Sequence, residues 1–421
     1  MKAILDAVGI DLGTNSSKCA YVRADKNNSP VIISNRWGRT STPSIVGWDG
    51  GWAVGEDAAR LFLSGSGPVW RDIKRQIGNE NFTVVCDGTR YMTHDVLTPL
   101  LRALREDAEV FLGRFVSSCA LAVPANFSTL QREVMTRAAE AAGMTNVRLI
   151  DEPVAAALAF GREGRFLILD FGAITSDISI VENEGGMWRI LESVENSEIG
   201  GRDFDIALAE WLRERLKLGN TPEGNPCWRA LLLEAEAIKI ALSSCLTYDW
   251  KPPSLDCREF PVVTIECEEL ERVTRFSIRR LLNMVRRLWE KHLPERLLLV
   301  GGSSRIPLVR EIIEREIVGP ERLTVCADES IAIGAALYAA RQECPSPDAV
   351  SGGDDHVDSS ASDRRTRDLK MRLVPVENAL TVAQKIRLHT MFDKLENLKD
   401  DVSAEILEGV VKDLEAELLS N

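Results

Sequence analysis

The chain has 421 residues, enough for two or three lobes that each bury a core of their own. Hydrophobic residues make up 45% and charged residues 27%, the composition of an ordinary soluble protein. A formal net charge of −13 argues against a nucleic-acid-binding surface, because phosphate backbones repel an acidic protein. The same net charge does not exclude binding of a nucleotide, because one metal ion and a few local hydrogen-bond donors are enough to hold it.

The N-terminal stretch predicts a strand and no targeting segment. Residues 1–13 form an apolar run interrupted by Asp6, without the basic start and the small-residue cleavage site of a signal peptide. No stretch approaches the roughly 20 apolar residues that span a bilayer. The nine cysteines are scattered without a CxxC pair, and the chain has four histidines. We therefore expect no metal cluster, no disulfide framework and a cytoplasmic location.

Two similar segments predict a pair of β-hairpins. Residues 8–14 (Val-Gly-Ile-Asp-Leu-Gly-Thr) lead into a strand-like stretch at 18–22. Residues 167–172 (Leu-Ile-Leu-Asp-Phe-Gly) lead, through Thr175, into another at 177–181. Each copy is typical of a strand, a tight Asp-x-Gly turn and a second strand. The copies are much further apart than the roughly 20 to 50 residues of a solenoid repeat, so we expect two similar lobes.

Helix signals alternate with strand signals in the middle of the chain. Ser128 begins a capping box, and Gly143 stops the same helix. Pro153 opens an alanine-rich helix that ends at Gly161. Residues 297–300 predict a buried strand, which a glycine-rich turn joins to another helix. Interleaved strands and helices indicate an α/β protein.

The composition changes after Arg341. The next 26 residues are rich in Ser, Asp, Gly and Pro, which predicts a disordered linker. Apolar positions from Leu388 to Leu398 and from Val402 to Leu418 then predict a short hairpin of two amphipathic helices. The predicted division is one domain at 1–341, with lobe I at about 1–165 and lobe II at about 166–341, a linker at 342–367 and a helical segment at 368–421.

Each Asp-x-Gly turn has two interpretations. Taken alone, it is more often an ordinary β-turn. A phosphate chain, however, needs several backbone N–H groups close to it, and glycine lets the backbone approach. A carboxylate at each turn can also hold Mg²⁺ through the water shell of the ion. Because the turn is duplicated, we predict that the hairpins hold phosphates from both sides, with Asp11 and Asp170 holding Mg²⁺ through water.

A series of segments resembles the nucleotide-binding domain of the seventy-kilodalton heat-shock chaperone family. The segments follow the family's order from about residue 8 to residue 341. They are 9–14, 39–44, 73–78, 122–127 with 131–132, 151–157, 199–205, 300–307 and 328–336. The resemblance implies an actin-like ATPase fold, with two lobes that are each built on a ribonuclease-H-like mixed sheet with helices. It also implies ATP or ADP with Mg²⁺ as ligands.

The resemblance assigns roles to individual residues. Lys74 would place a cation beside the γ-phosphate, and Glu152 and Asp170 would position the attacking water and Mg²⁺. Without the resemblance, Lys74 is a surface lysine and Glu152 a charge at a helix N-terminus. The implied catalytic set is Lys74, Glu152, Asp170 and Thr175. The implied nucleotide-binding set is Asp11, Gly13, Thr14, Asn15, Gly172, Gly200, Gly201, Glu236, Lys239, Ser243, Gly301, Gly302, Ser303, Arg305 and Asp328.

One helix face stands out within the second set. Glu236, Lys239 and Ser243 follow at i, i+3 and i+7 and so share one side of a helix. The resemblance implies that this face contacts the adenosine and that Arg305 stacks on the base. Read alone, the trio is more often a surface salt bridge beside a serine.

Two of the departures from the family pattern bear on function. The second turn has Gly172, Ala173 and Ile174 where the family has three glycines. We expect glycine-dependent backbone angles there to be costly for Ile174 and hydrolysis to be weak. The second departure is that the tail holds no run of alternating strands. A peptide-binding domain in the same chain is therefore not expected.

These features lead to an ATP-binding, chaperone-like switch with slow ATP hydrolysis. Its expected partners are the nucleotide and a co-chaperone, exchange factor or client-binding protein, with no nucleic acid and no membrane. The C-terminal helices would mediate partner binding or self-association, or would pack on the rest of the chain. The alternatives are a pseudo-ATPase scaffold, an actin-like assembly subunit and a small-molecule kinase of the same superfamily.

Overall fold

The computed structural model describes residues 7–343, with gaps at 24–28, 197–198, 220–224 and 256–257. Helix α9 (Ser330–Glu343) extends two residues past the predicted domain boundary at 341. The rest of the predicted linker and the whole C-terminal helical segment lie outside the described residues. Within the described residues, no helix combines the length and the hydrophobicity needed to cross a membrane.

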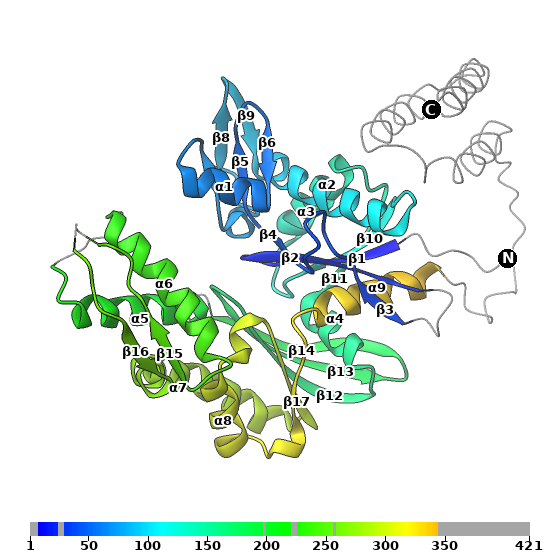
Figure 1. Ribbon diagram of the computed structural model, residues 1–421. Helices are drawn as coiled ribbons and strands as arrows, with labels where there is room; N and C mark the ends of the chain where they lie inside the picture. Colours follow the sequence, from blue (N-terminus) through cyan, green and yellow to red (C-terminus); the bar gives the residue numbers. More distant parts are fainter. Residues whose placement is uncertain (1–6, 24–28, 197–198, 220–224, 256–257, 344–421) are drawn as a thin grey trace, which may run out of the picture. The chain divides into compact units, whose positions relative to one another are not determined.

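The first predicted hairpin lies in a mixed sheet that we call the β1 sheet (Figure 1). Its order is β11-β10-β1-β2-β3, and β4 pairs with β2. β1 runs antiparallel to β2 and parallel to β10. The strands are β1 (Ala7–Leu12), β2 (Ser16–Val22), β3 (Pro30–Ile32), β4 (Thr42–Pro43), β10 (Ser118–Val123) and β11 (Asn146–Asp151).

The second hairpin lies in the β12 sheet, of order β14-β13-β12-β17-β18. Successive residues of β12 enter different cores. Leu167 and Leu169 contact a core shared with α5, α7 and α8, whereas Phe166 and Ile168 contact a core shared with α4 and α9. This burial on both faces explains the continuous apolar run in the sequence. The strands are β12 (Gly164–Phe171), β13 (Ser176–Glu184), β14 (Met187–Asn196), β17 (Arg296–Val300) and β18 (Leu323–Val325).

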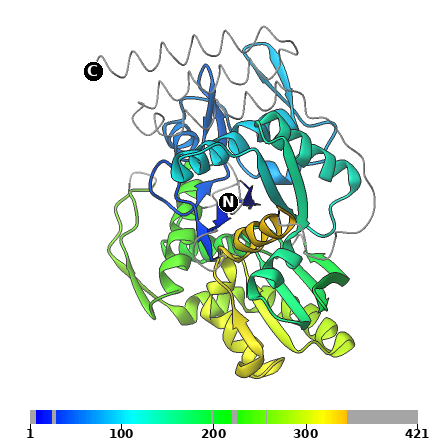
Figure 2. The same cartoon turned by 90° about the vertical axis from the view of Figure 1, so that its right-hand side faces the viewer.

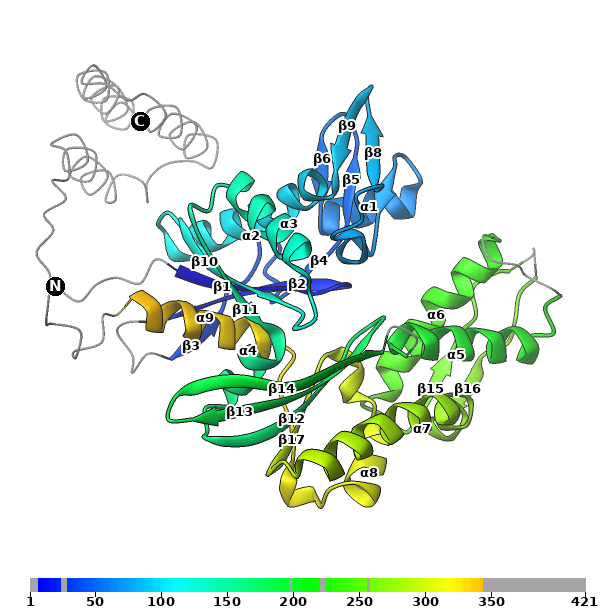
Figure 3. The ribbon, with the colours of Figure 1, turned by 180° about the vertical axis from the view of Figure 1, so that it is seen from behind.

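Helices α4 (Glu152–Phe160) and α9 lie between the two sheets (Figures 2 and 3). α9 packs on β1, β2 and β10, and α4 packs on β12, β13 and β14. Glycines allow the close approach: a Cβ on Gly9 would lie 2.0 Å from Ala336 N, and a Cβ on Gly334 would lie 1.8 Å from Ala155 O. Small residues therefore join the two sheets.

The remaining elements extend from the ends of these strands. Small sheets of order β6-β5-β7 and β8-β9 follow β4, and the β15–β16 hairpin lies between α6 and α7. Their bounds are α1 (Glu56–Ser64), α2 (Thr93–Leu112), α3 (Thr129–Ala141), α5 (Gly201–Arg215), α6 (Pro226–Leu242), α7 (Cys267–His292), α8 (Pro307–Glu316), η1 (Ile73–Gln76), η2 (Gly302–Arg305), η3 (Pro320–Arg322), β5 (Val46–Trp48), β6 (Trp52–Val54), β7 (Val69–Trp70), β8 (Thr83–Cys86), β9 (Thr89–Met92), β15 (Thr247–Trp250) and β16 (Val263–Glu266).

The local signals in the sequence are confirmed at these elements. Ser128 caps α3 with a capping box, and Gly143 follows the helix at φ 95°. Pro153 lies in the first turn of α4, and Gly161 caps its C-terminus in the left-handed conformation. The buried strand predicted at 297–300 is β17, and the helix after it is α8.

Candidate functional site

The two acidic side chains occupy matching positions in the two sheets. Asp11 is the second-last residue of β1, and Asp170 is the second-last residue of β12. Across the hairpins, Asp11 pairs with Lys18 and Asp170 with Asp177. Asp11 and Asp170 are near each other, since the charge of Asp11 contributes to raising the pKa of Asp170.

The first turn, Gly13 to Asn15, is a close backbone turn. A Cβ on Gly13 would lie 2.3 Å from the carbonyl oxygen of Ser16, so a larger residue does not fit. Thr14 is half-buried and Asn15 is exposed. The Asn15 carbonyl accepts a 2.9 Å hydrogen bond from the Ser44 N–H, which ties the turn to the segment after β4.

Two backbone carbonyls of the second turn accept three hydrogen bonds from outside the hairpin. Gly172 O accepts from the Gly201 N–H at 3.1 Å and from Ser303 Oγ at 2.8 Å. Ala173 O accepts from the Arg202 N–H at 2.7 Å. The turn therefore depends on the starts of α5 and η2, which begin at the second glycine of each Gly-Gly pair.

The expected backbone cost at Ile174 is wrong. Among the described residues other than glycine, only Asp72, Asp87, Lys217 and Leu293 have a positive φ, so Ala173 and Ile174 adopt ordinary angles. Gly172 also lacks a positive φ. The glycine that this turn requires is Gly200, where an added Cβ would lie 2.3 Å from the Ile174 carbonyl carbon. The turn therefore requires a residue without a side chain at position 200, which contacts the Ile174 backbone, and not at position 174.

A buried ion pair lies beside the acidic turns. Lys74 Nζ, from η1, donates to Glu152 Oε1 at 2.7 Å, and both side chains are largely inaccessible to solvent. Burial alone would lower the pKa of Lys74, but Glu152 and then Asp11 raise it overall. Burial also raises the pKa of Glu152, and Lys74 opposes that rise. The lysine is therefore a fixed cation among several carboxylates.

The carboxylates around Lys74 have raised pKa values. Burial raises the pKa of Asp11, with Lys18 and Lys74 opposing it. Burial raises the pKa of Asp170 well above its usual range, and Glu152 adds to the effect. Burial, then Glu152, raises the pKa of Asp177 to about 7. A cluster of this kind favours an added cation, because the ion compensates for the lost hydration and for the mutual repulsion.

Among the described residues, no three His, Cys, Asp or Glu side chains are arranged to hold a metal ion directly. One further oxygen nevertheless suits a ligand. Asp328 Oδ1 is buried and accepts no hydrogen bond, whereas its Oδ2 pairs with Arg305 at 2.7 Å. Asp328 also raises the pKa of Asp11, so these predicted residues are neighbours.

The predicted adenosine residues lie on α6 and near the Gly-Gly pairs. Lys239 is buried, pairs with Asp205 at 2.7 Å and donates to Gly201 O at 3.0 Å. Burial raises the pKa of Asp205 to about 6, Lys239 opposes the rise, and Glu236 adds to it. Ser243 caps α6, and its Oγ donates to the Lys239 carbonyl at 2.9 Å. Lys239 therefore forms its ion pair with Asp205 on α5 and not with Glu236 of the trio. This ion pair is buried, so the alternative of a surface salt bridge is wrong.

The other Gly-Gly pair brings the remaining predicted residues together. Gly301 has φ 83°, and a Cβ there would lie 2.5 Å from Asp170 Oδ1. Gly302 begins η2, which also contains Ser303 and Arg305. A Cβ on Gly201 would lie 2.3 Å from Ser303 Oγ. The glycines therefore allow η2, α5 and the end of β12 to approach one another.

Two acidic residues and one amide were missed from the sequence. Asp177 is the hairpin partner of Asp170, and the predicted register was sufficient to find it. Asp205 had no local signal, because its partner Lys239 is distant in sequence.

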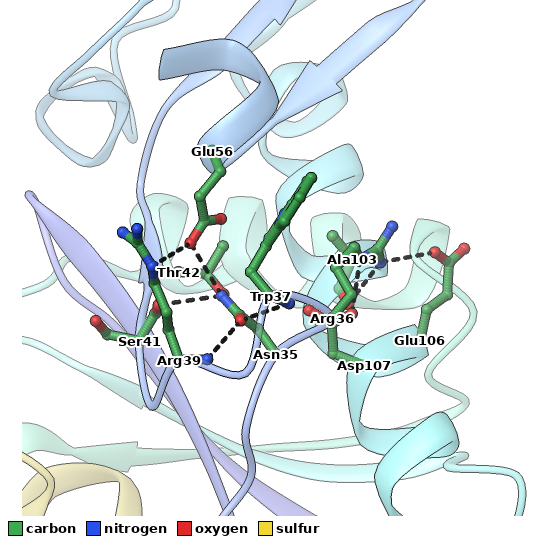
Figure 4. A network of polar contacts seen from close by, with 10 residues as sticks. All are labelled: Asn35, Arg36, Trp37, Arg39, Ser41, Thr42, Glu56, Ala103, Glu106 and Asp107. Carbon is green, nitrogen blue, oxygen red and sulfur yellow. Dashed lines mark hydrogen bonds and ion pairs between the residues drawn. The ribbon is translucent and has the colours of Figure 1, made fainter. Parts of the chain in front are cut away.

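Asn35, the missed amide, anchors a polar network (Figure 4). Its Nδ2 donates to Ser41 O, Thr42 Oγ1 and Glu56 Oε1, and its Oδ1 accepts two backbone N–H groups. The next residue, Arg36, pairs with Asp107 at 2.7 Å on α2. This network positions the segment whose Ser44 contacts the first turn.

Comparisons with known proteins match most of the chain. A family model described as Hsp70 protein matches residues 7–345. Chaperone protein DnaK of Thermosipho melanesiensis is 34% identical over 353 residues, which cover 79% of this chain and 59% of the relative. DnaK of Mycoplasma mobile is 31% identical, with 79% and 58% covered, and DnaK of Thermotoga maritima is 33% identical, with 79% and 59% covered. The chain thus spans 58% to 59% of the length of these relatives.

Proposed function

Because this chain belongs to the Hsp70 family, we propose that it binds ATP and ADP with Mg²⁺ and hydrolyses ATP slowly. One observation supports this proposal above the others. The Lys74–Glu152 ion pair lies within the electrostatic reach of both turn carboxylates, Asp11 and Asp170. A cation, a metal-binding pair and two glycine-containing turns are the parts that phosphoryl transfer to water requires.

Each part has a distinct role in the proposed reaction. Backbone N–H groups at Gly13 to Asn15 and at Ala173 to Thr175 would bind phosphate oxygens, and the Thr14 and Thr175 hydroxyls would add donors. Gly172 shapes the second turn, because its N–H donates to the Thr175 carbonyl. Asp11 and Asp170 hold Mg²⁺ through its water shell. When bound, Mg²⁺ would neutralise part of the phosphate charge. Lys74 adds a second positive charge, and Glu152 orients the attacking water.

The adenosine is proposed to lie between α6 and η2. Glu236, Lys239 and Ser243 face it from α6, and Arg305 stacks on the base. The buried Lys239–Asp205 pair supports this assignment, because it fixes the lysine beside the Gly201 carbonyl. Gly200, Gly201, Gly301 and Gly302 are proposed to contact the ligand through their backbone. An added Cβ would meet no atom within 4 Å at Gly302, whereas at the other three it would meet neighbouring protein atoms.

The chain is further proposed to act as a nucleotide-dependent switch. Its partners would be a co-chaperone, an exchange factor or a client-binding protein, and residues 368–421 would mediate self-association or partner binding. The scattered cysteines favour a cytoplasmic location. The family match favours this chaperone-like function over an actin-like assembly subunit or a pseudo-ATPase scaffold.

Calorimetric titration of the full chain with ATP and ADP, with and without Mg²⁺, tests binding, and a phosphate-release assay tests turnover. We expect Lys74→Met to retain nucleotide binding and to lose about 100-fold in phosphate release, because one charge-stabilising group is removed. Lys251→Met is the control, since Lys251 is exposed and the hydrogen bond it makes within the described residues goes to the Phe260 carbonyl. Absence of nucleotide binding, or equal rates for both variants, would contradict the proposal.

A further inference from the structure

One ion pair joins the residue before η1 to the start of α5, beside the proposed nucleotide site. Arg202 Nη1 lies 2.9 Å from Asp72 Oδ2, although the residues are 130 positions apart. Asp72 directly precedes η1, the short helix that carries Lys74. Arg202 is the second residue of α5 and directly follows Gly201.

The Arg202 end is tied to the second turn. Its backbone N–H donates to Ala173 O at 2.7 Å, and the preceding Gly201 N–H donates to Gly172 O at 3.1 Å. A displacement of the start of α5 would therefore displace the turn that follows Asp170. From this attachment, the side chain of Arg202 reaches Asp72.

The Asp72 end is tied to Lys74. Asp72 has φ 57° and ψ 27°, a left-handed conformation that Asp and Asn tolerate better than most residues. Its carbonyl accepts the Arg75 N–H at 3.0 Å, which begins η1. η1 in turn holds Lys74 against Glu152. The conformation of Asp72 therefore sets the position of the lysine-bearing segment.

We propose that the Arg202–Asp72 pair is a latch that holds the second turn and the Lys74 segment together and so slows nucleotide release. This inference rests on the proposed nucleotide site. Both are positioning residues. Arg202 acts through its hydrogen bond to the Ala173 carbonyl, and Asp72 acts through the start of η1. Neither belongs to the set predicted to bind the nucleotide.

The exposure of the pair limits the size of the effect. The Arg202 side chain is 54% exposed and that of Asp72 is 33% exposed, so water and salt screen the attraction. Loss of such a pair is expected to accelerate nucleotide release by about two- to fivefold. The acceleration should shrink as the salt concentration rises, because screening already weakens the wild-type pair.

The test uses the full chain loaded with a fluorescent ADP analogue and Mg²⁺, and follows release in a stopped-flow experiment after unlabelled ATP is added. The variants are Arg202→Gln, Asp72→Asn and the double variant; asparagine is chosen because it tolerates the left-handed backbone. Arg202→Lys keeps the charge and should restore part of the slow release. Arg310→Gln is the matched control, because Arg310 is 59% exposed and pairs with Glu314 within α8.

Both single variants should release the analogue faster than wild type at low salt, and the double variant should be no faster than the singles. Release unchanged in the single variants, additive effects in the double variant, or an equal acceleration in Arg310→Gln would overturn the latch while leaving nucleotide binding intact. A wild-type chain that does not bind the analogue would overturn the proposed function and the latch together.

Discussion

Buried charge dominates the site at the residue scale. Lys74 is enclosed with Glu152, and the carboxyl groups of Asp11, Asp170 and Asp177 have pKa values raised by burial. A charged group that is buried without enough hydrogen bonds or opposite charges destabilises the folded state. Such groups are found most often at ligand-binding and catalytic sites. The side chain of Ile174 is buried, and its backbone has ordinary angles, so the second turn keeps its geometry without three glycines.

Asp205 provides a pH test of this burial. Its pKa in the folded chain is about 6, above the value near 3.9 of an unfolded aspartate. The folded state therefore binds more protons between these values, and its stability falls as the pH rises from about 4 to about 6. Asparagine does not titrate, so the Asp205→Asn variant should not lose stability in this way. Between about pH 4 and about pH 6, the unfolding free energy of the wild type should therefore fall by up to about 3 kcal/mol relative to that of the variant.

Urea unfolding without nucleotide, at intervals between about pH 4 and about pH 8, measures this difference. It should be constant above about pH 7, where Asp205 is ionised in both states. Asp57→Asn, at an exposed position on α1, is the control. A wild-type-to-variant difference that does not change with pH would contradict the assignment.

Close packing of small residues is the main feature at the element scale. α4 and α9 lie between the sheets, and their contact depends on Gly334 facing the Ala155 carbonyl. The ends of α3 and α4 follow from local caps, because Ser128 and Gly161 act within one turn of their own helices. The contact between the two helices does not follow from such signals.

Gly334→Ala tests the helix contact. Alanine favours a helix over glycine by about 1 kcal/mol, but its Cβ would lie 1.8 Å from Ala155 O, which is backbone and cannot rotate away. We expect the variant to lose at least about 2 kcal/mol of unfolding free energy. Gly51→Ala is the control, since its added Cβ meets no atom within 4 Å and its φ is not positive. Equal denaturation midpoints for the two variants would show that α4 and α9 can separate at little cost.

At the scale of the whole molecule, every predicted site residue lies within residues 7–343, and the site draws on both sheets. Asp11 lies on β1 and Lys74 on η1, whereas Asp170 lies on β12, Lys239 on α6 and Ser303 on η2. A ligand that binds such a site should stabilise both sides together.

A chain ended at Glu343 tests this expectation. With ADP and Mg²⁺ at about 100 times the dissociation constant, we expect nucleotide to add about 2.7 kcal/mol of unfolding free energy to the shortened and the full chain alike. Thermal unfolding with and without ligand measures it. Gel filtration of the same two chains tests self-association through residues 344–421: an unchanged elution class would remove that role, and a ligand effect confined to the full chain would show that the tail contributes to the site.

Much of the fold and part of the site could be predicted from the sequence. The two Asp-x-Gly hairpins, the caps of α3 and α4, and the strand before Gly301 are local patterns, because turn and cap geometry depends on residues a few positions apart. The roles proposed for Lys74, Glu152 and Asp170 came from the family resemblance, since no local pattern separates a catalytic lysine from a surface lysine.

Only the tertiary structure decided how distant segments meet. The Lys239–Asp205 pair, the Arg202–Asp72 pair and the approach of Gly200 to Ile174 each join residues far apart in the chain, and burial and contact distance arise only when the chain is folded. The backbone at Ile174 is the clearest case. The residue types suggested strain, but the space for the turn comes from a glycine on another element.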